Sequence, residues 1–568
     1  MSYIVDASLR SYSVQVVQAA LREEYRSRSN GGKGGDGGQM VAEKMAIFYN
    51  LLRNVIRKKL TKFAASQLED LTMNSSTFLG EGHGSIEICE PPTEAQERII
   101  KSLVKVVFHQ LQTCGQSDKF ADVDEGHANL FLSLFVKSIH CEYFEETSLL
   151  NSDPELDVQD CIRRIFDGTG AENTRLSETQ KKTTFHHAAS FTVHLYCSLG
   201  HVSHGSGLLE EFDKIDLETD LCPGEEQSEG PTLASLSYNS ESLSELPISK
   251  QTLNLTRIAL LPSDNLEGLW ECLHFDDGIK RRLYSYATVA LKVASLSSQK
   301  PAEAAQSSFG NNKLILVHGP PGTGKTTVCK SLCQKLSIRR EFSREIDPLD
   351  ATHKGMIVEL SCSQIFSRWF GESSKNLATI FGDVENLLIA NQQTGSFVCL
   401  LIDEVEAIAF SRSDLLQKNE STDGVRVVST LLTQLDRLKK YNNLIILATS
   451  NLLESLDPAF IDRTDGVFYV GNPSRNGIAK ILSSGMKDMI TNGVITSMGD
   501  LSNVLNSLKY KKIMDLIAEK CLLAGTSGRT LSKLPLISLS EHFRTVPVSL
   551  DRFLIALAIS IRQLSEQA

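Results

Sequence analysis

Residues 313–326 read Lys-Leu-Ile-Leu-Val-His-Gly-Pro-Pro-Gly-Thr-Gly-Lys-Thr, and this stretch decides the fold. Its apolar start, residues 313–317, predicts a buried strand. The strand runs directly into the pattern Gly-x-x-x-x-Gly-Lys-Thr, and apolar residues at helical spacing follow at Val328, Leu332 and Leu336. A strand, a glycine-rich loop and a helix in this order are the context in which the pattern forms a phosphate-binding loop. We therefore expect an α/β fold with a nucleotide site at the carboxyl end of a buried strand.

The residue types of this loop explain the chemistry that we expect there. Glycines let backbone N–H groups turn inward around phosphate oxygens, and the following helix adds partial positive charge at its N-terminus. Lys325 is expected to reach the β- and γ-phosphates, and the hydroxyl of Thr326 is expected to bind Mg²⁺. The loop residues predicted to bind ATP are Gly319, Pro320, Pro321, Gly322, Thr323, Gly324, Lys325, Thr326 and Thr327.

Two further apolar runs end in polar residues that suit hydrolysis. Residues 397–402 predict a buried strand that ends at Asp403 and Glu404. Asp403 is expected to hold the hydration shell of Mg²⁺. Glu404 is expected to orient and deprotonate the attacking water, so hydrolysis is favoured over nucleotide binding alone. A third strand, over 443–448, is followed by Asn451, which either holds the same water from the other side or serves as a turn residue.

The composition limits the other functions of the chain. Its 568 residues are 41% hydrophobic and 22% charged, as in a soluble globular protein with several domains. The formal net charge of −11 argues against a dedicated surface for duplex DNA, so no direct nucleic-acid partner is expected. No apolar run approaches the roughly 18 residues of a membrane helix, and no secretory signal pattern is seen, so we expect no membrane association. Twelve cysteines without a Cys-x-x-Cys pair indicate reduced thiols.

Changes in composition divide the chain into four parts. An α+β N-terminal region over 1–200 is interrupted by a flexible glycine-rich joint at 30–39. An acidic, serine-rich linker follows over 201–250, because this segment lacks the apolar content that would offset the entropy of ordering. A large ATPase domain is expected over 251–472 and a helical domain over 473–568. Periodicity in the first part predicts helices over 8–28, 40–71, 93–111 and 128–139 and a strand over 189–199, and the last part has expected breaks at Pro473, Gly525 and Pro535.

The order of these motifs resembles the AAA+ ATPase module: the P-loop at 319–326, Asp403 with Glu404, Asn451, and a late Ser-Gly-Arg at 527–529. Within that superfamily the chain is similar to the pachytene checkpoint family, whose members remodel HORMA-domain proteins. The resemblance implies an AAA+ core, a parallel sheet flanked by helices, with a C-terminal helical lid. The stretches that carry it are residues 266–291, 316–330, 334–339, 366–370, 401–406, 425–428, 432–436 and 527–535.

The family resemblance also implies a function. The chain would form a homohexamer that hydrolyses ATP with Mg²⁺ and threads or partly unfolds HORMA-domain clients of the meiotic chromosome axis or the spindle checkpoint. A HORMA adapter would present the client to the N-terminal region, residues 1–200. Such a protein would act in meiotic recombination checkpoint control, in the nucleus on chromosomes, in the cytoplasm, or in both.

Four residues receive roles from the resemblance. Trp369 and Phe370 would form the first pore loop and grip the client in a central channel, since aromatic faces give contact that tolerates many sequences. A second pore loop would lie within residues 411–424. Arg529 would be the lid residue that senses the nucleotide phosphates. Arg463 would be the arginine finger that acts on the nucleotide of a neighbouring subunit, although it is shifted by about one residue from the general AAA pattern.

The sequence leaves other functions open. Gly371-Glu372-Ser373, after the pore aromatics, is more like microtubule-severing and ESCRT-disassembling AAA proteins. A second alternative is a scaffold in which ATP binding closes a ring without hydrolysis, against which Glu404, Asn451 and Arg463 argue. A clamp loader or DNA helicase is disfavoured by the negative net charge. The sequence does not identify the client, the adapter or the oligomeric state without ATP.

Overall fold

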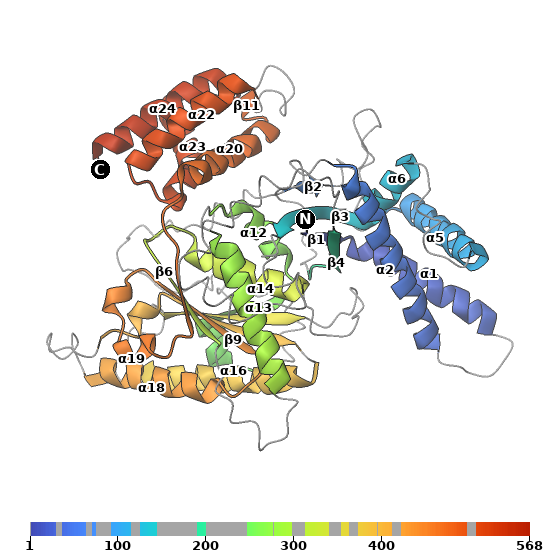
Figure 1. Ribbon diagram of the computed structural model, residues 1–568, viewed down its shortest axis with the longest axis horizontal. Helices are drawn as coiled ribbons and strands as arrows, with labels where there is room; N and C mark the ends of the chain where they lie inside the picture. The colour runs from blue at the N-terminus through green and yellow to red at the C-terminus, as the bar shows by residue number, and fades with distance from the viewer. Residues whose placement is uncertain are drawn as a thin grey trace, which may run out of the picture. The chain divides into compact units, whose positions relative to one another are not determined.

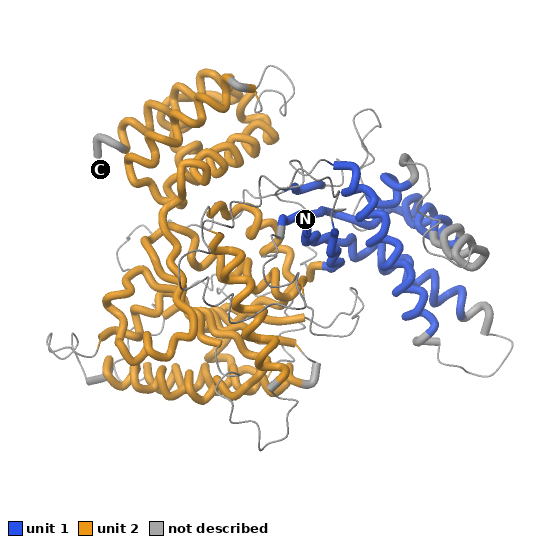
Figure 2. The backbone as a smooth tube through the Cα atoms, in the orientation of Figure 1, with its two compact units in different colours: residues 1–197, 345–350 blue, residues 198–344, 351–568 orange. Residues whose placement is uncertain are grey.

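The computed structural model describes residues 2–29, 37–63, 71–74, 92–114, 125–144, 190–199, 247–275, 278–297, 313–339, 354–362, 373–394, 396–411, 422–496 and 507–567. The chain divides into two units (Figure 2). One comprises residues 1–197 with 345–350, and the other comprises residues 198–344 with 351–568. Each unit is built around hydrophobic cores of its own.

The second unit contains a six-stranded sheet in the order β10-β6-β9-β8-β7-β5. Neighbouring strands run parallel except at one edge, where β5 is antiparallel to β7. The strands predicted over 313–317, 397–402 and 443–448 are present as β6, β8 and β9, so the predicted α/β fold is confirmed. The strands are β5 (Thr256–Leu261), β6 (Leu314–His318), β7 (Gly355–Ser361), β8 (Phe397–Asp403), β9 (Leu444–Ser450) and β10 (Gly466–Tyr469).

Both faces of this sheet are covered by helices, which explains why its strands are continuous apolar runs (Figure 1). Successive side chains of a strand point to opposite faces. In β6, Leu316 packs into the core with α16 and α18, whereas its neighbour Val317 packs into the core with α13 and α14. The helices are α13 (Ile279–Ser297), α14 (Lys325–Ile338), α16 (Ser373–Thr394) and α18 (Thr422–Leu438).

The chain enters the sheet through α11 (Lys250–Leu255), which is fastened to α16. The Asp383 carboxylate on α16 accepts hydrogen bonds from Ser249 N (3.0 Å), Ser249 Oγ (2.5 Å) and Thr252 Oγ1 (2.6 Å). Burial by itself would raise the pKa of Asp383, but these hydrogen bonds outweigh burial and lower that pKa. The remaining short elements of this domain are η3 (Asp264–Leu266), α12 (Leu269–Cys272), η6 (Val405–Ala407), η7 (Leu453–Ser455) and α19 (Pro458–Ile461).

A helical domain follows the sheet in the same unit. Its core includes Leu482, Leu531 and Phe553, one from each of three helices. The composition predicted a break at Pro535, but this residue lies inside α23 and is buried. Burial of its apolar ring offsets the loss of the backbone hydrogen bond that proline cannot donate. The elements are α20 (Arg475–Thr491), β11 (Ile495–Thr496), α22 (Leu508–Leu523), α23 (Gly528–His542), β12 (Val548–Ser549) and α24 (Leu550–Gln567).

The N-terminal unit combines a four-stranded sheet, in the order β2-β3-β1-β4, with helices. β1 is antiparallel to β3 and parallel to β4, and the core includes Val14, Phe48 and Phe131. The predicted α+β character is therefore confirmed. The elements are β1 (Ser2–Leu9), α1 (Ser11–Ser29), α2 (Gly37–Thr61), β2 (Thr72–Asn74), α5 (Glu94–Cys114), α6 (Glu125–Phe135), β3 (Val136–Phe144) and β4 (Ser190–Tyr196).

Several element boundaries predicted for this unit are wrong. The helix predicted over 128–139 ends at Phe135, because β3 pairs with β1 and β2 on its two sides and this pairing overrides the helical period of residues 136–139. The helix predicted over 40–71 is α2, which ends at Thr61 and begins inside the predicted joint, at Gly37. β1 had not been predicted. Residues 30–36 of the joint and 201–246 of the predicted linker lie outside the described residues.

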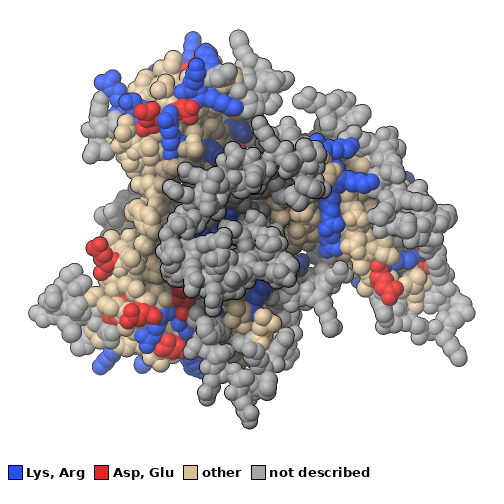
Figure 3. Space-filling view, in the orientation of Figure 1, with Lys and Arg blue, Asp and Glu red and all other residues tan. Residues whose placement is uncertain are grey.

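The face of the second unit drawn in Figure 3 carries charged side chains of both signs close together. In the same unit, Glu385 of α16 binds Arg437 of α18 and, at 3.1 Å, Lys440. These ion pairs join the two helices that cover one face of the sheet. In the described part of the chain, no helix combines the length and the apolar character that crossing a membrane requires.

Candidate active site

The predicted P-loop follows β6 directly, and α14 begins at Lys325. β6, β9 and β8 are parallel neighbours, so their carboxyl ends lie side by side at one edge of the sheet. The N–H of Gly319 donates to the carbonyl oxygen of Ser450 at the end of β9 (3.2 Å), which fastens the loop to that edge. The tertiary structure thus brings the loop together with Asp403, Glu404 and Asn451.

Two glycines of the loop stand where no other residue fits without strain. Gly324, the residue before α14, has φ of 90°, in the left-handed region that glycine adopts readily. A Cβ atom on Gly319 would lie 2.0 Å from the carbonyl oxygen of Val470, because the loop passes that close to the chain beyond β10. The glycines are therefore required by the path of the backbone itself.

Lys325 is held against the loop that it serves. Its Nζ donates to the carbonyl oxygens of Gly319 (2.9 Å) and Pro320 (2.7 Å). Burial lowers the pKa of Lys325, the carboxylates of Glu406, Asp403 and Glu404 oppose this, and the nearby Arg529 lowers the pKa further. The positive charges of Lys325 and Arg529 therefore repel each other beside the loop. A bound polyphosphate would neutralise both of them.

Asp403 and Thr326 form the pair that the sequence predicted for Mg²⁺. Thr326 Oγ1 donates to Asp403 Oδ1 (2.7 Å), and Thr449 Oγ1 at the end of β9 donates to the same oxygen (2.5 Å). Asp403 Oδ2 makes no hydrogen bond with any described residue. A hydroxyl and a carboxylate from two adjacent elements are the hard oxygen donors that Mg²⁺ prefers, so the residues present fit this ion.

Glu404 stands in a strained backbone conformation next to this pair. Its φ of 55° is the one positive value at a residue other than glycine in the described part of the chain. Its N–H donates to Thr449 Oγ1 (3.1 Å), and its side chain is exposed. Strain of this kind persists where the surrounding contacts impose it, often in active sites. The backbone leaves the strand direction at this residue, and the exposed Glu404 directly follows Asp403 in the chain.

Asn451 lies at the end of β9 and contacts the carboxylate of Glu406, a residue to which the sequence had assigned no role. Its backbone N–H and its Nδ2 both donate to Oε1 of Glu406, at 3.1 and 3.0 Å. Glu406 stands in η6, the turn that follows β8. The signal in the sequence was a third acidic residue in the run 403–406, within one turn of the predicted base.

Arg529 of the helical domain contacts the P-loop through its backbone. Its N–H donates to the carbonyl oxygen of Gly322 (3.0 Å), and Ser527 caps the start of α23 beside it. The Arg529 side chain is exposed, yet its charge acts on Lys325. The helical domain therefore meets the phosphate loop at the residue that the resemblance assigned to phosphate sensing.

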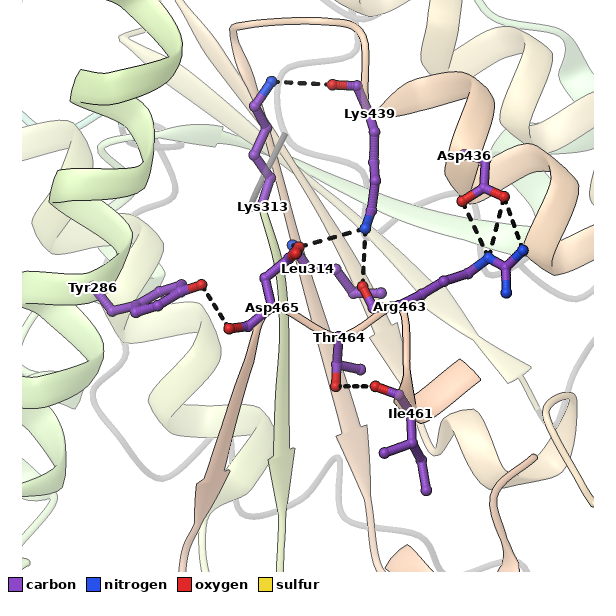
Figure 4. A network of polar contacts seen from close by, with 9 residues as sticks. All are labelled: Tyr286, Lys313, Leu314, Asp436, Lys439, Ile461, Arg463, Thr464 and Asp465. Carbon is purple, nitrogen blue, oxygen red and sulfur yellow. Dashed lines mark hydrogen bonds and ion pairs between the residues drawn. The ribbon is translucent and has the colours of Figure 1, made fainter. Parts of the chain in front are cut away.

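Arg463 is bound by its own chain (Figure 4). Its Nε donates to both carboxylate oxygens of Asp436 (3.1 Å each), its Nη2 donates to Oδ2 of Asp436 (3.1 Å), and its Nη1 donates to the carbonyl oxygen of Ala459 (2.9 Å). The side chain of Arg463 is 33% exposed. Three of the five N–H groups of the guanidinium are used in this way, and one hydrogen on each of Nη1 and Nη2 is left for another partner.

The backbone near Arg463 is held by a second set of contacts, also drawn in Figure 4. Lys439 Nζ donates to the carbonyl oxygen of Arg463 (2.9 Å) and forms an ion pair with Asp465 Oδ2 (3.5 Å). The same oxygen of Asp465 accepts from the N–H of Leu314 (2.9 Å), the first residue of β6. The loop of Arg463 is thereby tied to the strand that carries the P-loop.

The two residues expected to grip a client, Trp369 and Phe370, lie outside the described residues. Of the range 411–424 expected to contain the second pore loop, residues 412–421 also lie outside them, and Thr422–Gly424 belong to α18. Their predicted roles are not tested by the structure.

Two family models match the chain. Residues 315–472 match the ATPase family associated with various cellular activities (AAA). Residues 474–564 match the TRIP13-like AAA+ ATPase lid C-terminal domain. The two matches meet between β10 and α20, where the sheet domain gives way to the helical domain.

Full-length similarity extends to a named relative. Pachytene checkpoint protein 2 of Saccharomyces cerevisiae is 48% identical over 575 residues, which cover 100% of this chain and 99% of that protein. The pachytene checkpoint protein 2 homolog of Xenopus tropicalis is 35% identical over 314 residues, which cover 53% of this chain and 68% of that protein. A solved E. coli HORMA:CdnC:Trip13 complex contains a chain 16% identical to this one, with coverage of 54% of this chain and 94% of that chain and a TM-score of 0.41.

Proposed function

The chain belongs to the pachytene checkpoint protein 2 family of AAA+ ATPases, and we propose that it uses ATP hydrolysis to remodel HORMA-domain proteins that an adapter presents. Its membership of this family supports the ATPase activity. The client class, the adapter and a role in meiotic and spindle checkpoints are proposed from the family resemblance. So are a homohexameric ring and a location in the nucleus, on chromosomes, or in the cytoplasm.

One observation carries the hydrolytic part of the proposal: the hydrogen bond between Thr326 of the P-loop helix and Asp403 of β8 (2.7 Å), with Glu404 directly after it. A bound Mg²⁺ would neutralise charge on the β- and γ-phosphate oxygens. Thr326 and Asp403 are the residues that would hold it, and Lys325 binds the same phosphates as a point charge. This arrangement would hold the nucleotide next to the exposed carboxylate of Glu404.

The remaining polar residues serve the attack of water. Glu404 accepts a proton from the attacking water, and Asn451 holds that water from the other side. Arg463 of one subunit stabilises the transition-state charge on the nucleotide of its neighbour, through the two N–H groups that its own chain leaves unused. Arg529 reports the state of the phosphates to the lid.

The step from hydrolysis to client is a movement of the lid. Arg529 N bonds to the P-loop carbonyl of Gly322, so a change at the phosphates acts on the first turn of α23. Domain rotations driven by the γ-phosphate are a general way in which nucleotidases produce motion. In a ring, Trp369 and Phe370 of each subunit would follow that motion and pull on a client segment.

The proposal is tested by steady-state ATP hydrolysis of the purified chain beside two variants. Glu404→Gln keeps the shape of the site and removes the base, so kcat should fall by about 100-fold or more. ATP affinity should be retained. Glu454→Gln, an exposed carboxylate on η7, is the matched control and should behave as the wild type. Each protein is assayed alone and with a HORMA-domain protein and its adapter.

Hydrolysis that depends on Glu404 and rises with the HORMA pair supports both parts of the proposal. If the HORMA protein and its adapter do not change the rate of hydrolysis, the ATPase assignment stands and the proposed client class is contradicted. Microtubules and ESCRT filaments would then be the next clients to test. If Glu404→Gln hydrolyses ATP as fast as the wild type, the proposed base is wrong.

A further inference from the structure

Glu406 makes contacts that none of the roles above explains. It stands two residues after the proposed base, in η6, and its Oε1 accepts from both the backbone N–H and the Nδ2 of Asn451, at 3.1 and 3.0 Å. Hydrogen bonds to a carboxylate are stronger than those between neutral groups. One oxygen of Glu406 therefore fixes the main chain and the side chain of Asn451 together.

The contact decides which end of the Asn451 amide faces Glu406. An ionised carboxylate only accepts hydrogen bonds, so Nδ2 must face Glu406. Oδ1 then points away from Glu406, and it makes no hydrogen bond with any described residue. An acceptor in that place can take one hydrogen of a water molecule beside Glu404 and leave a lone pair of that water free to attack.

The Glu406 carboxylate holds its position at a cost. Its Oε2 is buried and accepts no hydrogen bond from the described residues. An unpaired buried carboxylate oxygen is unfavourable, and a role confined to packing would not need one.

The contact also fixes the position of the turn after β9. Glu406 holds the N–H of Asn451, while the preceding carbonyl, that of Ser450, accepts from the N–H of Gly319 in the P-loop (3.2 Å). The turn is thus held between η6 and the phosphate loop. A shift of Glu406 would move Asn451 relative to the phosphates, and misplacement of about 1 Å can cost about 100-fold in rate.

We propose that Glu406 is a positioning residue for ATP hydrolysis, whose carboxylate holds Asn451 in the orientation that orders the attacking water. The inference rests on the proposed roles of Glu404 and Asn451. Glu406 acts through Asn451 and does not itself touch the nucleotide.

A double-mutant cycle tests this dependence. Glu406→Ala, which removes the acceptor oxygen, Asn451→Ala and the double variant are compared with the wild type for kcat, for affinity toward a fluorescent ATP analogue and for the midpoint of thermal unfolding, with Glu454→Gln as control. Each single variant should lower kcat by about 10- to 100-fold. Affinity should change by less than about threefold, since Lys325 and the loop are intact. The double variant should be within about twofold of Asn451→Ala, because residues that act as a unit are not additive.

Losses that multiply in the double variant would show that the two residues act independently and would overturn the inference, as would wild-type kcat in Glu406→Ala. Should Glu406→Ala lose its fold, a charge swap gives a second test. Asn451→Asp sets two carboxylates against each other, and adding Glu406→Gln restores a donor to that contact. Recovery of kcat in the swapped pair supports the inference, and no recovery contradicts it. Loss of the Glu404 dependence itself would instead overturn the proposed function.

Discussion

Lys313, the residue before β6, shows how a single buried charge is accommodated in this fold. It is 1% exposed, and its Nζ donates to the carbonyl oxygens of Lys439 (3.2 Å) and Tyr441 (2.5 Å), just beyond the end of α18. A cation is favoured at the C-terminal end of a helix. Burial nevertheless lowers the pKa of Lys313 to about 8, although the nearby Asp465 raises it.

The lowered pKa predicts a pH dependence of stability. Below about pH 8 the folded and the unfolded chain both carry the proton, so the burial penalty is constant. Between about pH 8 and the ordinary value of 10.5 the unfolded chain binds more protons, so the free energy of unfolding contributed by Lys313 rises with pH. The urea concentration at the midpoint of unfolding should therefore rise with pH for the wild type relative to Lys313→Met between about pH 8 and 10.5.

The comparison is internal, because tyrosines and other lysines titrate in both proteins. Lys511→Met, a change of an exposed lysine on α22, should follow the pH profile of the wild type. Parallel profiles for the wild type and Lys313→Met would contradict the prediction.

At the scale of elements, the end of α18 controls the loop that carries Arg463. Asp436 of α18 binds the guanidinium, and Lys439, one residue beyond α18, binds the carbonyl oxygen of the same arginine. The side chain and the backbone of Arg463 are therefore both held by residues at the C-terminal end of α18 (Figure 4).

This arrangement predicts that Asp436 affects the rate of ATP hydrolysis only if Arg463 is the arginine finger. Asp436→Asn removes the charge that orients the guanidinium. If Arg463 serves a neighbouring subunit, kcat of the assembled protein should fall by about tenfold or more, since an oriented arginine finger is worth about 10³ to 10⁵ in other nucleotidases. The affinity of the subunit for its own nucleotide should be unchanged. The readouts are kcat at saturating ATP and binding of a fluorescent ATP analogue.

Asp462→Asn, next to Arg463 and exposed, is the control that should hydrolyse ATP normally. Arg463→Ala should lose at least as much as Asp436→Asn. Wild-type kcat in both variants would place the arginine finger elsewhere in the chain.

Element prediction succeeded where the pattern was local and failed where a distant partner decided. β6, β8 and β9 were predictable because strands buried on both faces are written as unbroken apolar runs. β3 was mistaken for the end of a helix. Its apolar residues suit either period, and its pairing with β1 and β2, which are distant in the sequence, selects the strand.

At the scale of the whole molecule, the family assignment predicts that hydrolysis and client handling are separable. Trp369→Ala should retain basal ATP hydrolysis, because the residue is assigned to the pore and not to the nucleotide site. It should lose remodelling of the proposed HORMA client, because the broad apolar contact is removed. Basal kcat and conversion of the client are measured on the same preparation.

Phe370→Ala is the companion variant and should show the same separation to a smaller degree. Equal loss of basal hydrolysis and remodelling in Trp369→Ala would instead assign Trp369 to the core of the ATPase domain.

The sequence by itself determined the fold class and most of the nucleotide chemistry. The P-loop, Asp403 and Glu404 follow contiguous strands, and contiguous patterns are legible without knowing what lies across the sheet. Only the tertiary structure decided which residues contact Asn451 and Arg463. Glu406 meets Asn451 from the next strand, and Asp436 meets Arg463 from a neighbouring helix end. Their side chains acquire a partner only when the strand order and the packing of α18 place them together, and no spacing along the chain encodes that distance.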